Sequence, residues 1–188
     1  MSREAIIERV TSETKINLEI KLDGKGESSI FTEIGFLDHM LTVFASYAFL
    51  DLHINVEGDI EIDSHHTVED VAIVLGKAIK EALSDNGGIV RHGHTILPME
   101  DALVLCALDI SGKPYLDFEA EFTTPKLGMM ETEMIEEFFR ALSIYAGLNL
   151  HIKVLAGKNN HHIAEAIFKA FAKAFDDAKK IDVRYDKI

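Results

Sequence analysis

Two hydrophobic periods alternate along this chain of 188 residues. From residue 5 to 23, apolar and polar side chains alternate along the chain, which is typical of a half-buried strand. A glycine-containing turn at 23–26 and a further stretch at 28–34 predict that this strand is paired in a hairpin. Residues 35–50 instead place apolar side chains three and four positions apart, which predicts an amphipathic helix.

The same succession of elements continues and then repeats. A strand at 51–57 and a helix at 67–83 complete the first half, and a link containing Gly87 and Gly88 follows. The second half is expected to contain strands at 95–99, 102–110 and 115–120, a helix at 132–146, a strand at 149–155 and a helix at 161–178. Both halves therefore follow the same plan, in which strands come first and are followed by a helix, a further strand and a second helix.

Each half ends with the same short motif. A His-His-x-x-Glu sequence occurs at 65–69 and at 161–165, each time after a short apolar strand and at the start of a helical pattern. The strands are offset by 98 positions and the histidine pairs by 96. We infer an internal duplication, with half-repeats at about 5–86 and 92–180 inside a single domain spanning 1–188. The expected fold class is α+β, with two antiparallel-rich sheets and helices packed between them.

Composition limits the classes of function. Acidic residues exceed basic ones by 32 to 19, and the net charge of −13 argues against a nucleic-acid partner and suits cationic ligands, metal ions included. The single cysteine, Cys106, lies in an apolar strand pattern and cannot form a disulfide within the chain, which indicates a reducing compartment. The sequence contains no membrane-length apolar run, and its start is too charged for a secretory signal. We therefore expect a cytoplasmic protein without membrane contact.

The two histidine pairs carry the candidate chemistry. Near the start of a helix, a glutamate can share a face with a histidine three or four positions before it, so Glu69 and Glu165 can each pair with either neighbouring histidine. Adjacent helical residues point about 100° apart, so the two histidines of a pair are expected to serve different metal ions. Imidazoles combined with a carboxylate suit Mn, Fe, Zn or Co.

The duplication adds one further candidate ligand to each half. His39 lies in the predicted helix 35–50, and the offset of 98 places Glu137 at the equivalent position. A single His-His-x-x-Glu is most often a solvated helix start, but two copies at matched places in a repeat favour metal binding. Two pseudo-symmetric half-sets of ligands would then form two metal sites.

Six motifs, in this order, extend the interpretation beyond metal binding: FLDHML at 36–41, DSHHTVED at 63–70, RHG at 91–93, PMEDA at 98–102, DISGKP at 109–114 and HHIAEA at 161–166. Together they resemble the imidazoleglycerol-phosphate dehydratase family, over about residues 5–188. The resemblance implies an internally duplicated fold of the ribosomal protein S5 domain 2 type, with two β-sheets packed on a layer of helices. It also implies dehydration of D-erythro-imidazole glycerol phosphate to imidazole acetol phosphate in histidine biosynthesis.

The same resemblance implies a metal centre and an assembly. Each active site would contain two Mn²⁺ ions, with other divalent transition metals as alternatives, and would be shared between subunits of a 24-chain homo-oligomer. One ion would be held by His39, His66, Glu69 and His161. The other would be held by His65, His162, Glu165 and Glu137.

Four further residues match positions that contact substrate in the family. Glu13 matches the catalytic carboxylate that moves a proton and contacts the substrate. The substrate's phosphate would meet the cations Arg91, Lys113 and Lys169. Three positions depart from the family pattern: Glu137 and Tyr47 stand where histidine is frequent, and Lys113 where many relatives have arginine.

Two other classes of function are compatible with paired histidines. A dinuclear metal hydrolase would release phosphate or an amine, whereas dehydration releases neither. A non-catalytic assembly joined by metal ions would change size with metal content but turn over no substrate. That second class would leave Glu13 and Arg91 without a role.

Overall fold

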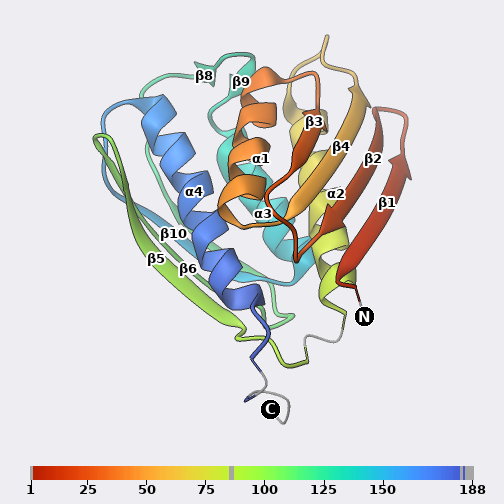
Figure 1. Cartoon of the computed structure of the whole chain (residues 1–188). Coiled ribbons are helices and arrows are strands. Elements are labelled where there is room, and N and C mark those ends of the chain that lie inside the picture. Colours follow the sequence, from red (N-terminus) through yellow and green to blue (C-terminus); the bar gives the residue numbers. More distant parts are fainter. Residues whose placement is uncertain (1, 85–86, 183, 185–188) are drawn as a thin grey trace.

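The computed structural model describes residues 2–84, 87–182 and 184 (Figure 1). The first half contains β1 (Glu4–Val10), β2 (Thr14–Lys21), β3 (Ser28–Phe31), α1 (Gly35–Tyr47), β4 (Asp51–Gly58) and α2 (His65–Leu83). The second half contains β5 (His92–Met99), β6 (Ala102–Asp109), β7 (Tyr115–Glu119), β8 (Lys126–Leu127), β9 (Met130–Glu131), α3 (Met134–Ala146), β10 (Asn149–Ala156) and α4 (Asn160–Lys179). Within the described ranges, none of the helices is both long and apolar enough to cross a membrane.

The first β-region differs from the prediction in two ways. The alternating stretch 5–23 is not one strand, because it turns at Thr11, whose hydroxyl accepts the backbone N–H of Thr14 at 2.9 Å and closes the β1–β2 hairpin. The predicted hairpin between this stretch and 28–34 is wrong, since β3 pairs in parallel with β4. β4 occupies the free edge of β2 over its full length, and α1 provides the long crossover that parallel neighbours require.

The two halves build sheets of the same topology. The strand orders are β1-β2-β4-β3 and β5-β6-β10-β7, so corresponding strands occupy corresponding places. Figure 1 shows the two sheets on opposite sides of the molecule with the four helices between them. α2 packs on β1 and β2, α4 packs on β5 and β6, and the helices meet as the pairs α2–α3 and α1–α4. This is the expected duplicated α+β fold of the ribosomal protein S5 domain 2 type, while the limits of the half-repeats stay a prediction.

Buried aromatic rings fix α4 against its neighbours. Phe44 of α1 stacks on Phe171 of α4 with ring centroids 5.3 Å apart. Phe139 of α3 packs against Phe168 of α4 at 5.0 Å, and all four rings are buried. Such pairs stabilise a core beyond the apolar area that they bury. The packing therefore sets the position of α1 beside α4.

The contact between β5 and α4 is closer than a side chain allows. A Cβ atom at Gly93 would lie 1.8 Å from the carbonyl oxygen of Ala174. Glycine at this position thus permits the helix to lie directly on the strand. In the first sheet, the equivalent second position of β1 is the buried Ala5, so the first half accommodates a methyl group there.

Candidate metal centre

Local hydrogen bonds position both histidine pairs at helix starts. The side-chain oxygen of Asn159 accepts the backbone N–H groups of His161 at 2.9 Å and His162 at 3.3 Å. Asp63 accepts the N–H of His65 at 2.8 Å in the first half. These polar side chains satisfy donors that a helix start leaves unpaired. Figure 1 shows α2 and α4 running from the top of the view to the bottom, so both pairs lie at the same end of the molecule.

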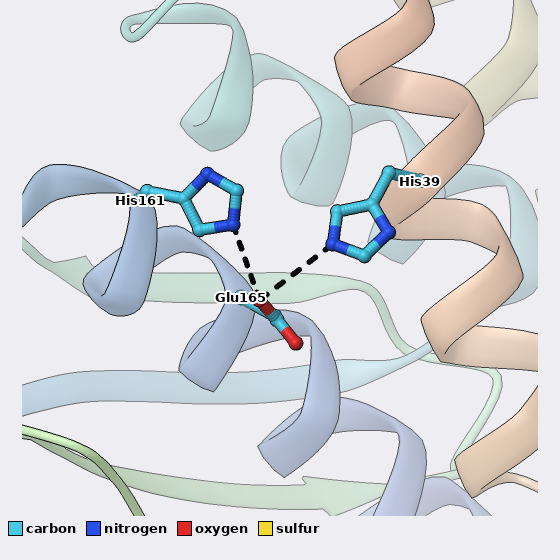
Figure 2. Close-up of side chains that lie close together, drawn as sticks. All are labelled: His39, His161 and Glu165. Atoms are coloured by element: carbon cyan, nitrogen blue, oxygen red, sulfur yellow. Dashed lines mark hydrogen bonds and ion pairs between the residues drawn. The ribbon is translucent and has the colours of Figure 1, made fainter.

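Three predicted ligands converge between α1 and α4. His161 Nε2 lies 3.2 Å from Glu165 Oε2, and His39 Nε2 lies 3.6 Å from the same oxygen (Figure 2). The three ligand atoms all lie within 4.8 Å of one another. Atoms bound to one ion at about 2 Å would lie about 3–4 Å apart, so two imidazoles and a carboxylate are close to a coordinating arrangement. The donor set suits Mn, Fe, Zn or Co.

Lys169 keeps the central carboxylate charged. Its Nζ lies 2.8 Å from Glu165 Oε1, the oxygen that does not face the histidines, and 5.2 Å from the ring centre of Tyr47. Burial by itself would raise the pKa of Glu165, but the hydrogen bond and charge of Lys169, together with His39 and His161, outweigh it and leave that pKa lowered. Glu165 is thus an ionised carboxylate with one oxygen directed at the histidines, as a cation site requires.

The first histidine pair has a more open arrangement. His65 Nε2 lies 3.6 Å from Glu69 Oε2, and about half of each side chain is exposed. His66 Nδ1 lies 2.9 Å from Asp59 Oδ2, and this hydrogen bond is the main cause of a raised pKa of His66. Glu13, from the β1–β2 turn, places Oε1 3.9 Å from His66 Nε2. The predicted catalytic carboxylate therefore lies beside a predicted ligand.

The second pair has a carboxylate partner that the sequence interpretation did not include as a site residue. Asp101, in the β5–β6 turn, places Oδ1 2.6 Å from His162 Nδ1. The hydrogen bonds from His162 and from the backbone of Asn159 and Lys158 hold the pKa of Asp101 well below its usual range. Asp59 was also missed. The signal for Asp101 was its place in the PMEDA motif, whereas Asp59 lay in a polar stretch without a distinguishing pattern.

Three predicted site residues lie apart from these groups within one chain. Glu137 faces Arg140, with 3.5 Å between Oε1 and Nε, and in the described part of the chain it belongs to no metal-sized cluster. Arg91 pairs with Asp109 at 2.6 Å, and its backbone N–H bonds Ala178 at the far end of α4. That end lies about 25 Å along the helix from His161. Lys113 is exposed in the turn after β6.

Within one chain, the grouping of ligands differs from the prediction. The sequence interpretation placed His39 and His161 with His66 and Glu69, and Glu165 with the second ion. The structure brings Glu165 to His39 and His161 instead. Helical spacing explains the pairing within each motif, because residues four apart share a face (His65 with Glu69, His161 with Glu165). The packing of α1 on α4 brings His39 to the same glutamate. Membership of all eight residues in a metal centre stays a prediction.

Fold and centre together define a class of protein. A duplicated α+β scaffold carries two imidazoles and an ionised carboxylate at its helix layer, which is a candidate transition-metal site. The family model described as imidazoleglycerol-phosphate dehydratase matches residues 32–175. The chain belongs to this family and is an enzyme, a hydro-lyase that acts at a dehydration step of histidine biosynthesis.

Individual relatives and solved structures agree over nearly the whole chain. Imidazoleglycerol-phosphate dehydratase of Lachnoclostridium phytofermentans is 59% identical over 184 residues, covering 98% of this chain and 94% of the relative. That of Acetivibrio thermocellus is 54% identical over 188 residues, covering 100% and 96%. The crystal structure of the Staphylococcus aureus enzyme has a TM-score of 0.86 at 40% identity and covers 95% of this chain and 99% of that one.

Proposed function

We propose that the chain converts D-erythro-imidazole glycerol phosphate to imidazole acetol phosphate at a dinuclear Mn²⁺ site shared between subunits. The observation that carries this proposal is the convergence of His39, His161 and Glu165 in a member of a dehydratase family. We further propose a cytoplasmic homo-oligomer of 24 chains that binds this small phosphorylated imidazole and neither nucleic acid nor membrane. The net charge of −13 supports the exclusion of nucleic acid.

The proposed ligands are the donor groups present at the two helix starts and on α1 and α3: His39, His65, His66, Glu69, Glu137, His161, His162 and Glu165. Imidazole and carboxylate donors fit a divalent transition metal of the Mn type. When bound, the ions would act as Lewis acids that stabilise negative charge on the substrate's imidazole ring.

Subunit sharing is supported by how far apart the proposed residues lie in one chain. His161 and Arg91 are at opposite ends of α4, so one substrate molecule cannot contact both in the same chain. The half-exposed His65 and Glu69 are likewise accessible to a neighbouring chain. A second copy would complete the site by placing its Arg91 beside these ligands. The cations Arg91, Lys113 and Lys169 would then bind the phosphate and orient the reacting end.

Glu13 is the proposed acid–base group. Dehydration removes a hydroxyl group from one carbon of the glycerol chain and a proton from its neighbour, and the resulting enol becomes the ketone. A carboxylate near the bound ring can accept that proton and return it in the final step. The exposed Glu13 side chain, 3.9 Å from His66 Nε2, supports this assignment.

The proposal is tested by turnover of imidazole glycerol phosphate after chelation and after Mn²⁺ is added back. We expect ketone formation, followed by absorbance, to disappear on chelation and to return with Mn²⁺. Inorganic phosphate is measured in the same samples, because its release would indicate a hydrolase instead. Metal-dependent assembly without ketone or phosphate would support the non-catalytic alternative and overturn the dehydratase proposal.

A further inference from the structure

A carboxylate holds one ring nitrogen of the second histidine in each pair. Asp101 Oδ1 lies 2.6 Å from His162 Nδ1, and Asp59 Oδ2 lies 2.9 Å from His66 Nδ1. A carboxylate acceptor keeps the imidazole proton on Nδ1, so the lone pair is on Nε2. His39 and His161 also direct Nε2, not Nδ1, at Glu165. Nε2 is therefore the possible metal donor of His66 and His162, whereas the Nε2 atoms of His39 and His161 face Glu165, which is itself a proposed ligand.

Asp101 is itself held rigidly. Its Oδ2 accepts the backbone N–H of Lys158 at 2.6 Å and that of Asn159 at 3.0 Å. Asn159 in turn accepts the N–H groups of His161 and His162. One carboxylate thus connects the β5–β6 turn both to the start of α4 and to the ring of His162. A ring fixed at its base and at Nδ1 has little freedom to rotate, which is the condition for a preorganised ligand.

We propose that Asp101 is a positioning residue that keeps His162 in its Nδ1–H tautomer and directs Nε2 at a divalent metal ion. Asp59 has the same role toward His66 in the first half. The inference rests on the proposed function, in which His162 and His66 are ligands. Nothing in the histidine motif itself identifies these carboxylates, because Asp59 and Asp101 come from different connections of the fold, one after β4 and one between β5 and β6.

The fold also contains a matched pair for comparison. His151 Nδ1 lies 3.2 Å from Asp117 Oδ2, where β10 and β7 run side by side. This pair has the same chemistry, but His151 belongs to neither histidine motif. Asp117→Asn is therefore a control for the loss of an Asp–His hydrogen bond, together with a 3.5 Å ion pair to Lys153, at a site where no metal role is proposed.

The test compares Asp101→Asn with Asp117→Asn in the full-length chain. The asparagine oxygen can still accept the two backbone N–H groups, but its NH₂ group then faces Nδ1 and donates to it. We expect His162 to change from the Nδ1–H to the Nε2–H tautomer, as read by ¹⁵N-histidine NMR of the chelator-treated protein. We also expect Mn²⁺ affinity, measured by competition with a fluorescent chelator, to fall by about 10- to 100-fold. Asp101→Glu should recover part of that affinity.

The outcomes separate this inference from the proposed function. Unchanged Mn²⁺ affinity in Asp101→Asn, or an equal loss in Asp117→Asn, would overturn the positioning role and leave the dehydratase proposal intact. A wild-type chain that bound no Mn²⁺ would overturn both. If circular dichroism showed Asp101→Asn to be misfolded, Asp59→Asn would decide the same question at His66, with an unchanged tautomer and affinity counting against the proposal.

Discussion

The two histidine motifs are alike in sequence, yet they form different surroundings. In the second half, His161 and the buried Glu165 meet His39 from α1, and all three ligand atoms lie within 4.8 Å of one another. In the first half, His65 and Glu69 pair at 3.6 Å with about half of each side chain exposed. The equivalent of His39 is Glu137, which faces Arg140 instead.

This difference shows what a motif can and cannot specify. Helical spacing makes the first histidine of each motif meet the glutamate four positions later, so both halves share the local pair. Three ligand atoms close enough to bind one metal ion are obtained only when another helix adds a third donor to this pair. Only α1 supplies it in the described part of a single chain, through His39. Under the proposed sharing of sites between subunits, this first half is where a second chain would complete a site. The predictions that follow test this contrast.

The largest effect on activity is expected at the group formed by His39, His161 and Glu165. Glu165→Ala removes the carboxylate that joins His39 to His161 and leaves Lys169 without its partner. Loss of a Lewis acid forfeits several kcal/mol of transition-state stabilisation, which corresponds to about a 10⁴-fold fall in kcat. Elemental analysis should show about one ion fewer per active site. Wild-type metal content in this variant would contradict the assignment of Glu165 as a ligand.

A slightly smaller effect on activity is expected from Glu13, which lies beside His66 in the first half of the chain. Glu13→Gln should lower kcat by about 10³-fold, because general acid–base catalysis typically contributes 10²- to 10⁴-fold. Metal content and assembly should be unchanged, since the amide keeps the shape of the side chain. Glu8→Gln, on the preceding strand, is the control. Normal turnover in Glu13→Gln would remove Glu13 from the mechanism.

His65→Ala tests whether the first histidine motif binds metal at all. We expect about one ion fewer per active site, together with a smaller assembly by size-exclusion chromatography, because this pair would bind its ion jointly with another chain. His53→Ala, on β4, removes an exposed histidine outside both motifs and should leave the metal content unchanged. Unchanged metal in His65→Ala would mean that the first motif is only a solvated helix start.

The two sheets should also differ in how they tolerate a methyl group. Gly93→Ala forces a Cβ against the Ala174 carbonyl oxygen and should destabilise the chain by about 3 kcal/mol in urea unfolding, at the upper end of overpacking costs. Ala5→Gly, at the equivalent position of β1, should cost only about 1 kcal/mol through backbone entropy. Equal losses of unfolding free energy in the two variants would mean that α4 can shift away from β5 without destabilising the chain.

The smallest effect concerns acid stability at the start of α2. The Lys126 ammonium and the Ser64 hydroxyl lower the pKa of Glu131 from 4.5 to about 2. A carboxyl group with a lowered folded-state pKa stabilises the fold above pH 4.5, and the contribution is lost as pH falls toward 2. Glu131→Gln should therefore cost about 1 kcal/mol at neutral pH, allowing for solvent screening, and progressively less as the pH falls through about 2. Glu133→Gln, at an exposed position nearby, is the control variant.

The sequence alone determined the elements and the local pairs. Periods of two and of 3.6 residues predicted the strands and helices because burial of one face imposes those periods. The repeat of His-His-x-x-Glu predicted the duplication and placed four histidines at helix starts. The 5–23 region was assigned incorrectly, because the turn at Thr11 interrupts the alternation without a glycine or proline to mark it. The two-residue strands β8 and β9 were not predicted, because they are too short to show a period.

Tertiary structure decided which residues from distant parts of the chain meet. Three results could not be obtained from spacing: the parallel pairing of β3 with β4, the arrival of His39 at Glu165, and the support of His162 by Asp101. Each joins segments separated by an entire element or more, and their meeting depends on how whole helices and sheets pack. A hydrophobic period specifies which face of an element is buried, but the partner buried against that face is fixed only when all the elements are packed together.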